Sequence, residues 1–329
     1  PHPDSPEHPE PYVADPPLKK AINLAMYLRR PILLEGDAGC GKTRLASAVA
    51  YELGLPLYRW DIRSTTNAQD GLYEYDAILR LHDVQAQANL ASQSEPIAPG
   101  GGQGSIDPDK DAEGNYPDSP PAQRDPSKPW HYRTFGPLGK AFKQRQCPAV
   151  VLIDEIDKAD LDFPNDLLAV LDEPWEFPIK ETGETIRAAR DCRPIVIITS
   201  NKEKGNLPAP FLRRCLYYYV DFPNDPQRLK DIVERHYQYA EQYPSEGESV
   251  VSDAPPAPLV DNAIARFLAV WTEGGLFKKP GTSEFLDWLK ALYTFEPNPY
   301  DASRLQSEEK LPYRELLFKR QEDWRKYAQ

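Results

Sequence analysis

The sequence is poor in cysteine and contains no long apolar run. Its four cysteines, Cys40, Cys147, Cys192 and Cys215, are far apart and form no metal-ligand pair. Isolated thiols of this kind are typical of reduced proteins, so we expect a cytoplasmic location. No apolar stretch approaches the roughly 20 residues that a membrane-spanning helix needs. The first residues also lack the basic and apolar regions of a secretory signal, so the sequence favours a protein with no membrane span.

Basic residues are fewer than acidic residues. The chain carries 39 lysines and arginines against 51 acidic residues, a formal net charge of -12. A surface of that sign repels phosphate backbones on average, so general nucleic-acid binding is disfavoured unless a local basic patch overrides it. Hydrophobic residues make up 40% and charged residues 27%, which is the balance of a soluble globular protein. The length of 329 residues suffices for a large core and a second, smaller unit.

Proline is abundant, with 35 residues, and it concentrates near the start of the chain and in one internal stretch. Proline blocks helix and sheet hydrogen bonding, so we expect a disordered, proline-rich tail at residues 1–16. Residues 90–128 are rich in Ser, Pro, Gly, Gln and Asp, which predicts a flexible insertion. The rest divides into a core at 17–222, which contains the insertion, and a helical unit at 223–329.

Short apolar runs alternate with helical patterns across the core. We predict strands at 31–36, 57–62, 148–153, 194–199 and 216–220. We predict helices at 17–30, 43–53, 70–85 and 163–171, and a hairpin over Trp175 to Arg187. Strands that alternate with helices argue for an α/β fold in which helices cover both faces of a parallel sheet. Helical periodicity then continues at 225–243, 260–275, 282–295 and 313–328, which predicts a small all-helical domain.

A glycine-rich segment lies between a predicted strand and a predicted helix. Its residues are Gly36, Asp37, Ala38, Gly39, Cys40, Gly41, Lys42 and Thr43, which match the Walker A pattern. Glycines let the backbone wrap around a phosphate with its N–H groups inward, and the following helix adds the positive end of its dipole. Lys42 supplies a cation for the outer phosphates, and Thr43 offers a hydroxyl to Mg²⁺. The segment predicts a nucleotide-binding loop; the alternative is a glycine turn that matches by chance.

Two acids end the apolar run that begins at Val150. Because ligands of open α/β sheets bind at the carboxyl ends of the strands, Asp154 and Glu155 are placed to act on a nucleotide. Asp154 is predicted to hold the Mg²⁺ shell, and Glu155 to polarise the attacking water as a general base. The alternative is a strand followed by an acidic loop, since Asp157 and Asp160 are close by.

Two further polar positions follow the same logic. Asn201 closely follows the predicted strand PIVIIT, where an amide can orient the lytic water or contact the γ-phosphate; the alternative is a turn residue. Arg213 and Arg214 precede the last strand, and one of them, preferably Arg214, is predicted to stabilise transition-state charge on a neighbouring subunit's nucleotide. The alternative is a solvated or structural arginine.

The segments GDAGCGKT, VVLIDEID, ITSN and LRRC, followed by a helical unit, resemble an AAA+ ATPase. Within that class the chain is similar to the MoxR family through RPILLEGDAGCGKT, LIDEIDKADLDFPNDLLAVLDE, PIVIITSN, PAPFLRRC and STTNAQDGLYEYDA. The resemblance covers roughly residues 17–300. It implies a P-loop NTPase αβα sandwich with a five-stranded parallel sheet in the order 5-1-4-3-2 and a C-terminal helical lid.

The resemblance also implies a function. ATP and Mg²⁺ would bind between core and lid, at the interface of adjacent subunits in a homo-oligomeric ring, commonly a hexamer. Asn201 would match the sensor-1 position and Arg214 the arginine finger. Such ATPases are chaperone-like: they remodel a protein substrate or mature its metal cofactor, often with a von Willebrand factor A domain protein.

The chain departs from the family pattern in the lid. Many relatives carry a sensor-2 arginine in a Ser-Pro-Arg context, where this chain reads GTSEF from Gly281 to Phe285. Lys278 and Lys279 lie nearby as candidate substitutes. The residues leave other functions open: a nucleic-acid-linked AAA+ NTPase (helicase loader or restriction-type motor), a non-catalytic nucleotide switch, and a small-molecule kinase. The acidic balance counts against the first of these, and Glu155 counts against the other two.

Overall fold

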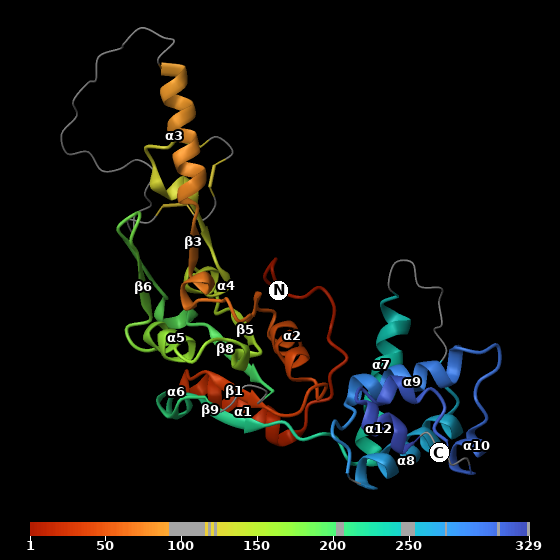
Figure 1. The fold of residues 1–329 in the computed structure, drawn as a ribbon. Helices are drawn as coiled ribbons and strands as arrows, with labels where there is room; N and C mark the ends of the chain where they lie inside the picture. The colour runs from red at the N-terminus through yellow and green to blue at the C-terminus, as the bar shows by residue number, and fades with distance from the viewer. Residues whose placement is uncertain are drawn as a thin grey trace.

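The computed structural model describes residues 1–91, 116–117, 120–121, 124–201, 207–244, 254–273, 275–307 and 310–327, so most of the insertion predicted at 90–128 lies outside the described residues. Figure 1 shows an α/β core, coloured red to green, and a helical unit, coloured teal to blue. The core contains, in chain order, α1 (Pro16–Leu28), β1 (Ile32–Glu35), α2 (Lys42–Leu53), β2 (Leu57–Asp61), β3 (Tyr73–Tyr75), α3 (Ala77–Ala91), β4 (Arg133–Phe135), α4 (Pro137–Phe142), β5 (Val150–Asp154), α5 (Phe163–Leu171), β6 (Glu176–Ile179), β7 (Glu184–Arg187), β8 (Ile195–Ser200), α6 (Ala209–Arg214) and β9 (Leu216–Tyr219).

The central sheet has five strands in the order β2-β5-β8-β1-β9, and each neighbouring pair is parallel. Counted along the chain among these five strands, the order is 2-3-4-1-5, which is the predicted 5-1-4-3-2 seen from the other edge. The predicted α/β fold is therefore confirmed. Because the strands are parallel, the segments that follow β1, β5 and β8 meet at one edge of the sheet.

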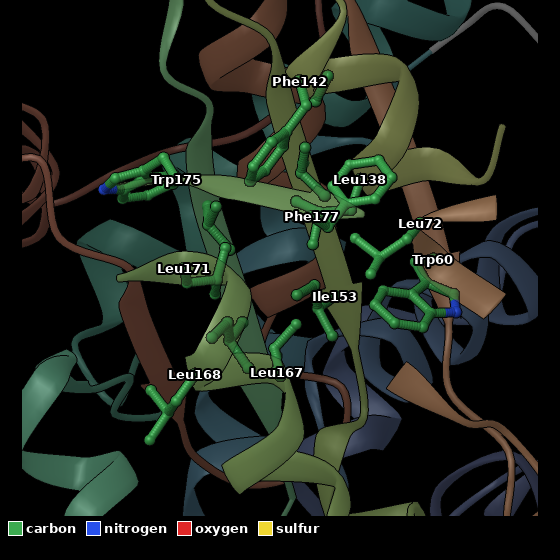
Figure 2. Packing of buried hydrophobic residues seen from close by; sticks show 14 of the residues in the cluster. Trp60, Leu72, Leu138, Phe142, Ile153, Leu167, Leu168, Leu171, Trp175 and Phe177 are labelled. Atoms are coloured by element: carbon green, nitrogen blue, oxygen red, sulfur yellow. The ribbon is translucent and has the colours of Figure 1, made fainter. Parts of the chain in front are cut away.

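Successive residues of the sheet strands pack alternately into two hydrophobic cores, one on each face of the sheet. In β5, Val150 and Leu152 pack toward α1 and α2, whereas Val151 and Ile153 pack toward α4 and α5. Figure 2 shows the second of these cores. A fully buried aliphatic side chain contributes about 1.5–3 kcal/mol, so these two layers hold the strand ends in fixed positions.

An arm extends from the core, with α3 at its end (Figure 1). β3 pairs antiparallel with β4, and Tyr73 lies opposite Phe135. A short 3-10 helix (Ala68–Gly71) and β3 therefore replace the first part of the helix predicted at 70–85. Gly71 lies against Trp60, since a Cβ on Gly71 would come within 2.3 Å of the Trp60 ring. The hairpin predicted over 175–187 is present as β6 and β7.

The helical unit, called the lid below, comprises α7 (Pro226–Gln242), α8 (Ala257–Glu273), α9 (Thr282–Thr294), α10 (Ala302–Ser307), α11 (Arg314–Leu317) and α12 (Gln321–Lys326). It has its own core, in which Phe267, Phe285 and Trp288 are buried. The single helix predicted at 313–328 is split into α11 and α12, because the backbone adopts an extended conformation at Phe318. Among the described residues, no helix is long and apolar enough to cross a bilayer.

Residues 1–15 lie along the core, which differs from the disordered tail that their composition predicts. The His2 N–H donates to the Gly54 carbonyl at 3.0 Å, and the Leu57 N–H donates to the Asp4 carbonyl at 3.1 Å. Asp15 caps α1 by accepting from the Leu18 N–H at 2.8 Å. Proline-rich chains need no secondary structure of their own when neighbouring elements supply partners for their backbone groups.

Candidate nucleotide-binding site

The glycine-rich loop from Gly36 to Thr43 joins β1 to α2. Gly39 and Gly41 adopt positive φ angles of 79° and 87°, which side-chain-bearing residues rarely adopt. Lys42 is buried, and its Nζ donates to the carbonyls of Gly36 at 2.7 Å and Asp37 at 2.8 Å. Burial raises the pKa of the Cys40 thiol, which therefore stays protonated within the loop. The loop thus holds a charged amine beneath a backbone turn that is shaped for an anion.

Asp154 is the meeting point of three strand ends. Its carboxylate accepts from the Thr43 hydroxyl at 3.0 Å and from the Thr199 hydroxyl at 2.6 Å. It also accepts from Arg59 Nη2 at 3.0 Å, while Arg59 Nε donates to Asp61 at 2.6 Å. The sequence did not single out Arg59, which lies in the middle of β2 opposite Leu152 and reaches Asp154 only through its long side chain. Asp154 thereby faces both the glycine-rich loop and a fixed guanidinium.

Glu155 lies beside Asn201. The Asn201 Nδ2 donates to Glu155 Oε1 at 3.1 Å, and Lys158 pairs with the other carboxylate oxygen. The Glu155 backbone adopts a left-handed conformation with φ 60°, and its N–H donates to the Thr199 hydroxyl at 2.9 Å. The Asn201 N–H donates to Asp157 at 3.1 Å. These contacts bring together the acid and the amide that the sequence placed on separate strands.

The lid reaches the glycine-rich loop through backbone atoms. The Thr282 N–H, at the start of α9, donates to the Gly39 carbonyl at 3.1 Å. Gly281 lies so close that a Cβ there would be 2.8 Å from the Ala38 carbonyl oxygen. Glu284 accepts from the Gly281 N–H at 3.1 Å and so caps α9. At the stretch where the family resemblance implies an arginine, this chain therefore places a helix-capping carboxylate.

A second part of the lid also faces the site. Arg228, Ile232 and His236 are spaced four residues apart on α7 and line the same cavity. Arg228 Nη1 donates to Asp15 at 3.1 Å, whereas its Nε is buried and has no partner among the described residues. His236 Nδ1 is likewise buried and unpartnered within that part of the chain. Burial lowers the pKa of His236, and the positive charge of Arg44 lowers it further. We did not predict these residues from the sequence, because a charged residue in a helix is usually solvent-exposed.

The cavity has a volume of about 580 Å³ and is shared by three parts of the chain. The core contributes the glycine-rich loop, Arg59, Asp154, Glu155 and Asn201, and the lid contributes the residues of α7 and α9. Tyr12, from the N-terminal segment, closes one side: a Cβ on Gly41 would be 3.0 Å from its ring. A cavity of this size falls within the usual range for small-molecule sites.

Not all predicted residues lie here. Arg213 and Arg214 are on α6, outside the cavity, and Arg214 Nε pairs with Asp172 at 2.6 Å. Lys279 Nζ lies 3.7 Å from the centroid of the Trp271 ring within the lid. Neither Lys278 nor Lys279 lines the cavity, so they do not substitute for the sensor-2 arginine in this structure.

The donor set at Thr43 and Asp154 suits magnesium. A hydroxyl and a carboxylate lie within 3.0 Å of each other, and Mg²⁺ in nucleotide sites takes one or two protein oxygens together with phosphates and waters. Among the described residues, no cluster of three or more His, Cys, Asp or Glu side chains forms a separate metal site. The fit therefore rests on these two oxygen ligands.

An open parallel sheet in this order, with a Walker A loop and an acid pair at adjoining strand ends, is the arrangement of a P-loop NTPase fold, and with a helical lid beside it the chain resembles the AAA+ class. The chain is similar to protein NorQ of Paracoccus denitrificans (strain Pd 1222), with 27% identity over 211 residues, which is 62% of this chain and 57% of NorQ. The match thus spans little more than half of the relative. It bears out the resemblance to MoxR-type AAA+ ATPases.

Two other comparisons add little. No protein-family model matches the chain. Two solved structures of Thermotoga maritima RuvB, one described as a Holliday junction branch migration motor, overlap it with TM-scores of 0.43 and 15% identity. They cover 90% and 92% of this chain and 69% and 71% of their own. Overlap at that level adds no support to the assignment.

Proposed function

We propose that this chain is a Mg²⁺-dependent ATPase that works as a homo-oligomeric ring. The observation that carries the proposal is the convergence of Thr43, Asp154, Glu155 and Asn201 around one cavity beneath the lid. The triphosphate would lie over the loop, with Lys42 as its cation. Mg²⁺, held by Thr43 and Asp154, would neutralise charge on the outer phosphates.

In the proposed reaction, water attacks the γ-phosphorus while the bond to the β–γ bridging oxygen breaks, which leaves ADP and phosphate. Glu155 accepts the proton of the attacking water. Asn201 holds the Glu155 carboxylate through the 3.1 Å hydrogen bond and so fixes the direction in which that base points. Lys42 donates to phosphate oxygens in place of the loop carbonyls that it contacts here.

The lid supplies the remaining walls. Arg228 offers a guanidinium whose Nε has no competing partner within the described chain, and Ile232 offers an apolar surface for a base. Arg213 and Arg214 lie outside the cavity of their own chain, which suits an arginine finger that acts on the neighbouring subunit of a hexamer. Ring assembly and finger role are parts of the proposal.

The biological role that we propose is chaperone-like remodelling of a protein substrate or maturation of its metal cofactor, together with a von Willebrand factor A domain protein in the cytoplasm. The likeness to MoxR-type ATPases supports this role. A pull-down with the Glu155→Gln variant and ATP should capture such a partner, because a trapped ATP state prolongs complexes that hydrolysis would release. Recovery of nucleic acid instead of protein would contradict the role.

The enzymatic proposal is tested by phosphate release with ATP and Mg²⁺. We expect turnover in the native chain, loss of turnover with retained ATP binding in Glu155→Gln, and loss of both in Lys42→Ala. Lys140→Ala, an exposed lysine on α4, is the matched control and should behave as the native chain. Native turnover no faster than that of Lys42→Ala would overturn the proposal.

A further inference from the structure

An arginine from the middle of a strand reaches the acid that is proposed to bind the metal. Arg59 lies opposite Leu152 in the pairing of β2 with β5, and its side chain lines the nucleotide cavity. Its Nη2 donates to Asp154 Oδ2 at 3.0 Å, while its Nε donates to Asp61 Oδ1 at 2.6 Å. One guanidinium is thus shared between a buried carboxylate and an exposed one, since the side chains of Asp154 and Asp61 are 8% and 62% exposed.

Both oxygens of Asp154 already accept hydrogen bonds. Oδ1 accepts from the hydroxyls of Thr199 at 2.6 Å and Thr43 at 3.0 Å. Oδ2 accepts from Arg59 and also lies 3.2 Å from the Thr43 hydroxyl. A carboxylate has about four lone-pair sites, so a metal ion bound directly to Asp154 needs one of these positions. The hydroxyls are neutral, whereas the guanidinium repels a cation, so Arg59 is the partner that leaves Asp154.

Lysine and arginine side chains line the cavity on two sides. Among the described residues, those in its wall are Lys42, Arg44, Arg59 and Arg228. Arg44 pairs with Glu10 at 3.3 Å. Arg228 pairs with Asp15 at 3.1 Å, so both of these arginines are bound to the N-terminal segment. Arg59 is bound instead to the metal-binding acid, on the side where the proposed function puts the outer phosphates.

We propose that Arg59 binds the γ-phosphate of ATP and so makes the site prefer ATP to ADP, with Asp61 as the positioning residue that holds the guanidinium there. The inference rests on the proposed ATPase and assigns one of its phosphate ligands. When nucleotide and metal are bound, Arg59 releases Asp154 Oδ2, keeps its Nε hydrogen bond to Asp61, and turns its Nη donors to the terminal phosphate. A guanidinium suits this role because its N–H donors form a planar fork that matches phosphate oxygens.

The neighbours of Arg59 favour the terminal phosphate over the inner two. The hydrogen bond to Asp61 raises the pKa of Arg59, and the charges of Asp154 and Glu155 raise it further. Arg59 is therefore close to both acids that are proposed to act on the γ-phosphate. The inner phosphates lie over the backbone N–H groups of the glycine-rich loop, which need no arginine. Since ADP lacks the group that Arg59 binds, loss of Arg59 should weaken ATP binding and leave ADP binding unchanged.

The test compares ATP and ADP affinity in variants of the full chain. Displacement of a fluorescent ADP measures the binding of the β,γ-imido analogue of ATP and of ADP, each with Mg²⁺. In Arg59→Gln, affinity for the ATP analogue should fall about tenfold or more, because a hydrogen bond to a charged group is lost, with ADP affinity unchanged within about twofold. Arg59→Lys keeps a cation and should recover part of the preference for ATP. Asp61→Asn should lose a smaller part, because the guanidinium remains but is held less firmly.

Arg63→Gln is the matched control, because Arg63 follows β2, is exposed and lies outside the cavity; both affinities should stay unchanged. Equal losses for both nucleotides in Arg59→Gln would overturn the inference and leave Arg59 as a support for Asp154. Tighter binding of both would also overturn it and make Arg59 a competitor of Mg²⁺.

If Arg59→Gln binds neither nucleotide, Arg59→Lys and Asp61→Asn decide: a reduced preference for ATP supports the inference, and an unchanged preference in both overturns it. Failure of the native chain to bind ATP with Mg²⁺ would overturn the proposed function and this inference together. An unchanged ratio of ATP to ADP affinity in Arg59→Gln overturns the inference alone, so the two failures are distinct.

Discussion

The two halves of the nucleotide cavity are built in different ways. The core half consists of side chains at the ends of strands: Asp154, Glu155 and Asn201 converge because β5 and β8 are parallel neighbours. The lid half consists of a backbone hydrogen bond from Thr282 and a helical stripe that begins at Arg228. The core half follows a strict sequence pattern, whereas the lid half is set by packing and leaves little trace in the sequence.

The difference separates two roles: the chemistry on the phosphate, and the coupling between the nucleotide and the lid. Atoms that act on the phosphate must be placed within a fraction of an ångström, and a rigid sheet does this best. Coupling between nucleotide and lid needs only a contact that changes with lid position, and many residue types can make one. The absence of a sensor-2 arginine therefore removes one possible contact and leaves the lid with two others, at Thr282 and Arg228.

The largest effect on the comparison between core half and lid half is expected when the guanidinium of Arg228, in the lid, is removed. Arg228→Ala should weaken ATP binding roughly tenfold or more, since a hydrogen bond to a charged group contributes about 1.5–3 kcal/mol. A fluorescent nucleotide titration measures the change. Arg235→Ala is the control, because Arg235 is on the same helix but outside the nucleotide cavity. Unchanged affinity in Arg228→Ala would mean that the lid contributes shape without charge.

A smaller effect is expected at the backbone contact. Gly281→Ala adds a Cβ that would lie 2.8 Å from the Ala38 oxygen and 3.0 Å from Gly39 Cα, so the lid or the loop must move apart. The backbone of Gly281 is extended, so the substitution adds no conformational strain of its own. We expect ATP affinity to fall several-fold, on the order of 1 kcal/mol, with the Thr282 hydrogen bond weakened.

Hydrogen exchange at the Thr282 N–H checks this directly and should be faster in Gly281→Ala. Ser283→Ala, at the next but one position, tests whether any change in this turn has the same effect. Equal losses in both variants would argue against a specific role for the close approach of Gly281 to the loop.

The smallest expected effect concerns pH. Burial lowers the pKa of His236 below its ordinary value of 6.5, so the unfolded chain binds this proton more readily than the folded chain. Above pH 6.5 His236 is neutral in both states and costs nothing; as pH falls through 6.5, stability is lost. Urea unfolding at a series of pH values should show a shallower loss in His236→Gln.

His82→Gln is the control for the pH series, because the His82 side chain is 77% exposed. If both variants show the same pH dependence as the native chain, His236 is not buried in solution, and the lid stands farther from the core than it does here. That result would weaken the case for a closed lid half.

The sequence predicted the sheet, and it placed Thr43, Asp154, Glu155 and Asn201 in segments that the structure brings around one cavity, since Walker patterns fix both identity and spacing. It missed the arm because β3 and β4 pair across a separation that local periodicity does not reveal. Arg59 was missed because a strand of alternating residues gives no sign of which polar side chain meets an acid on the next strand. Arg228 and His236 were not predicted as site residues, because their sequence is that of an ordinary helix. Only the packing of the lid on the core shows that the face of α7 which carries them lines the cavity.

The N-terminal segment has a practical consequence for anyone who shortens this protein. A version that begins at α1 keeps every motif, yet it removes Tyr12 from the wall beside Gly41 and Glu10 from its 3.3 Å pairing with Arg44. It also strips Arg228 of Asp15, its tether to the core. Domain boundaries drawn from motifs alone would discard a structural wall of the pocket, and poor nucleotide retention in such a fragment would reflect the cut and not the enzyme.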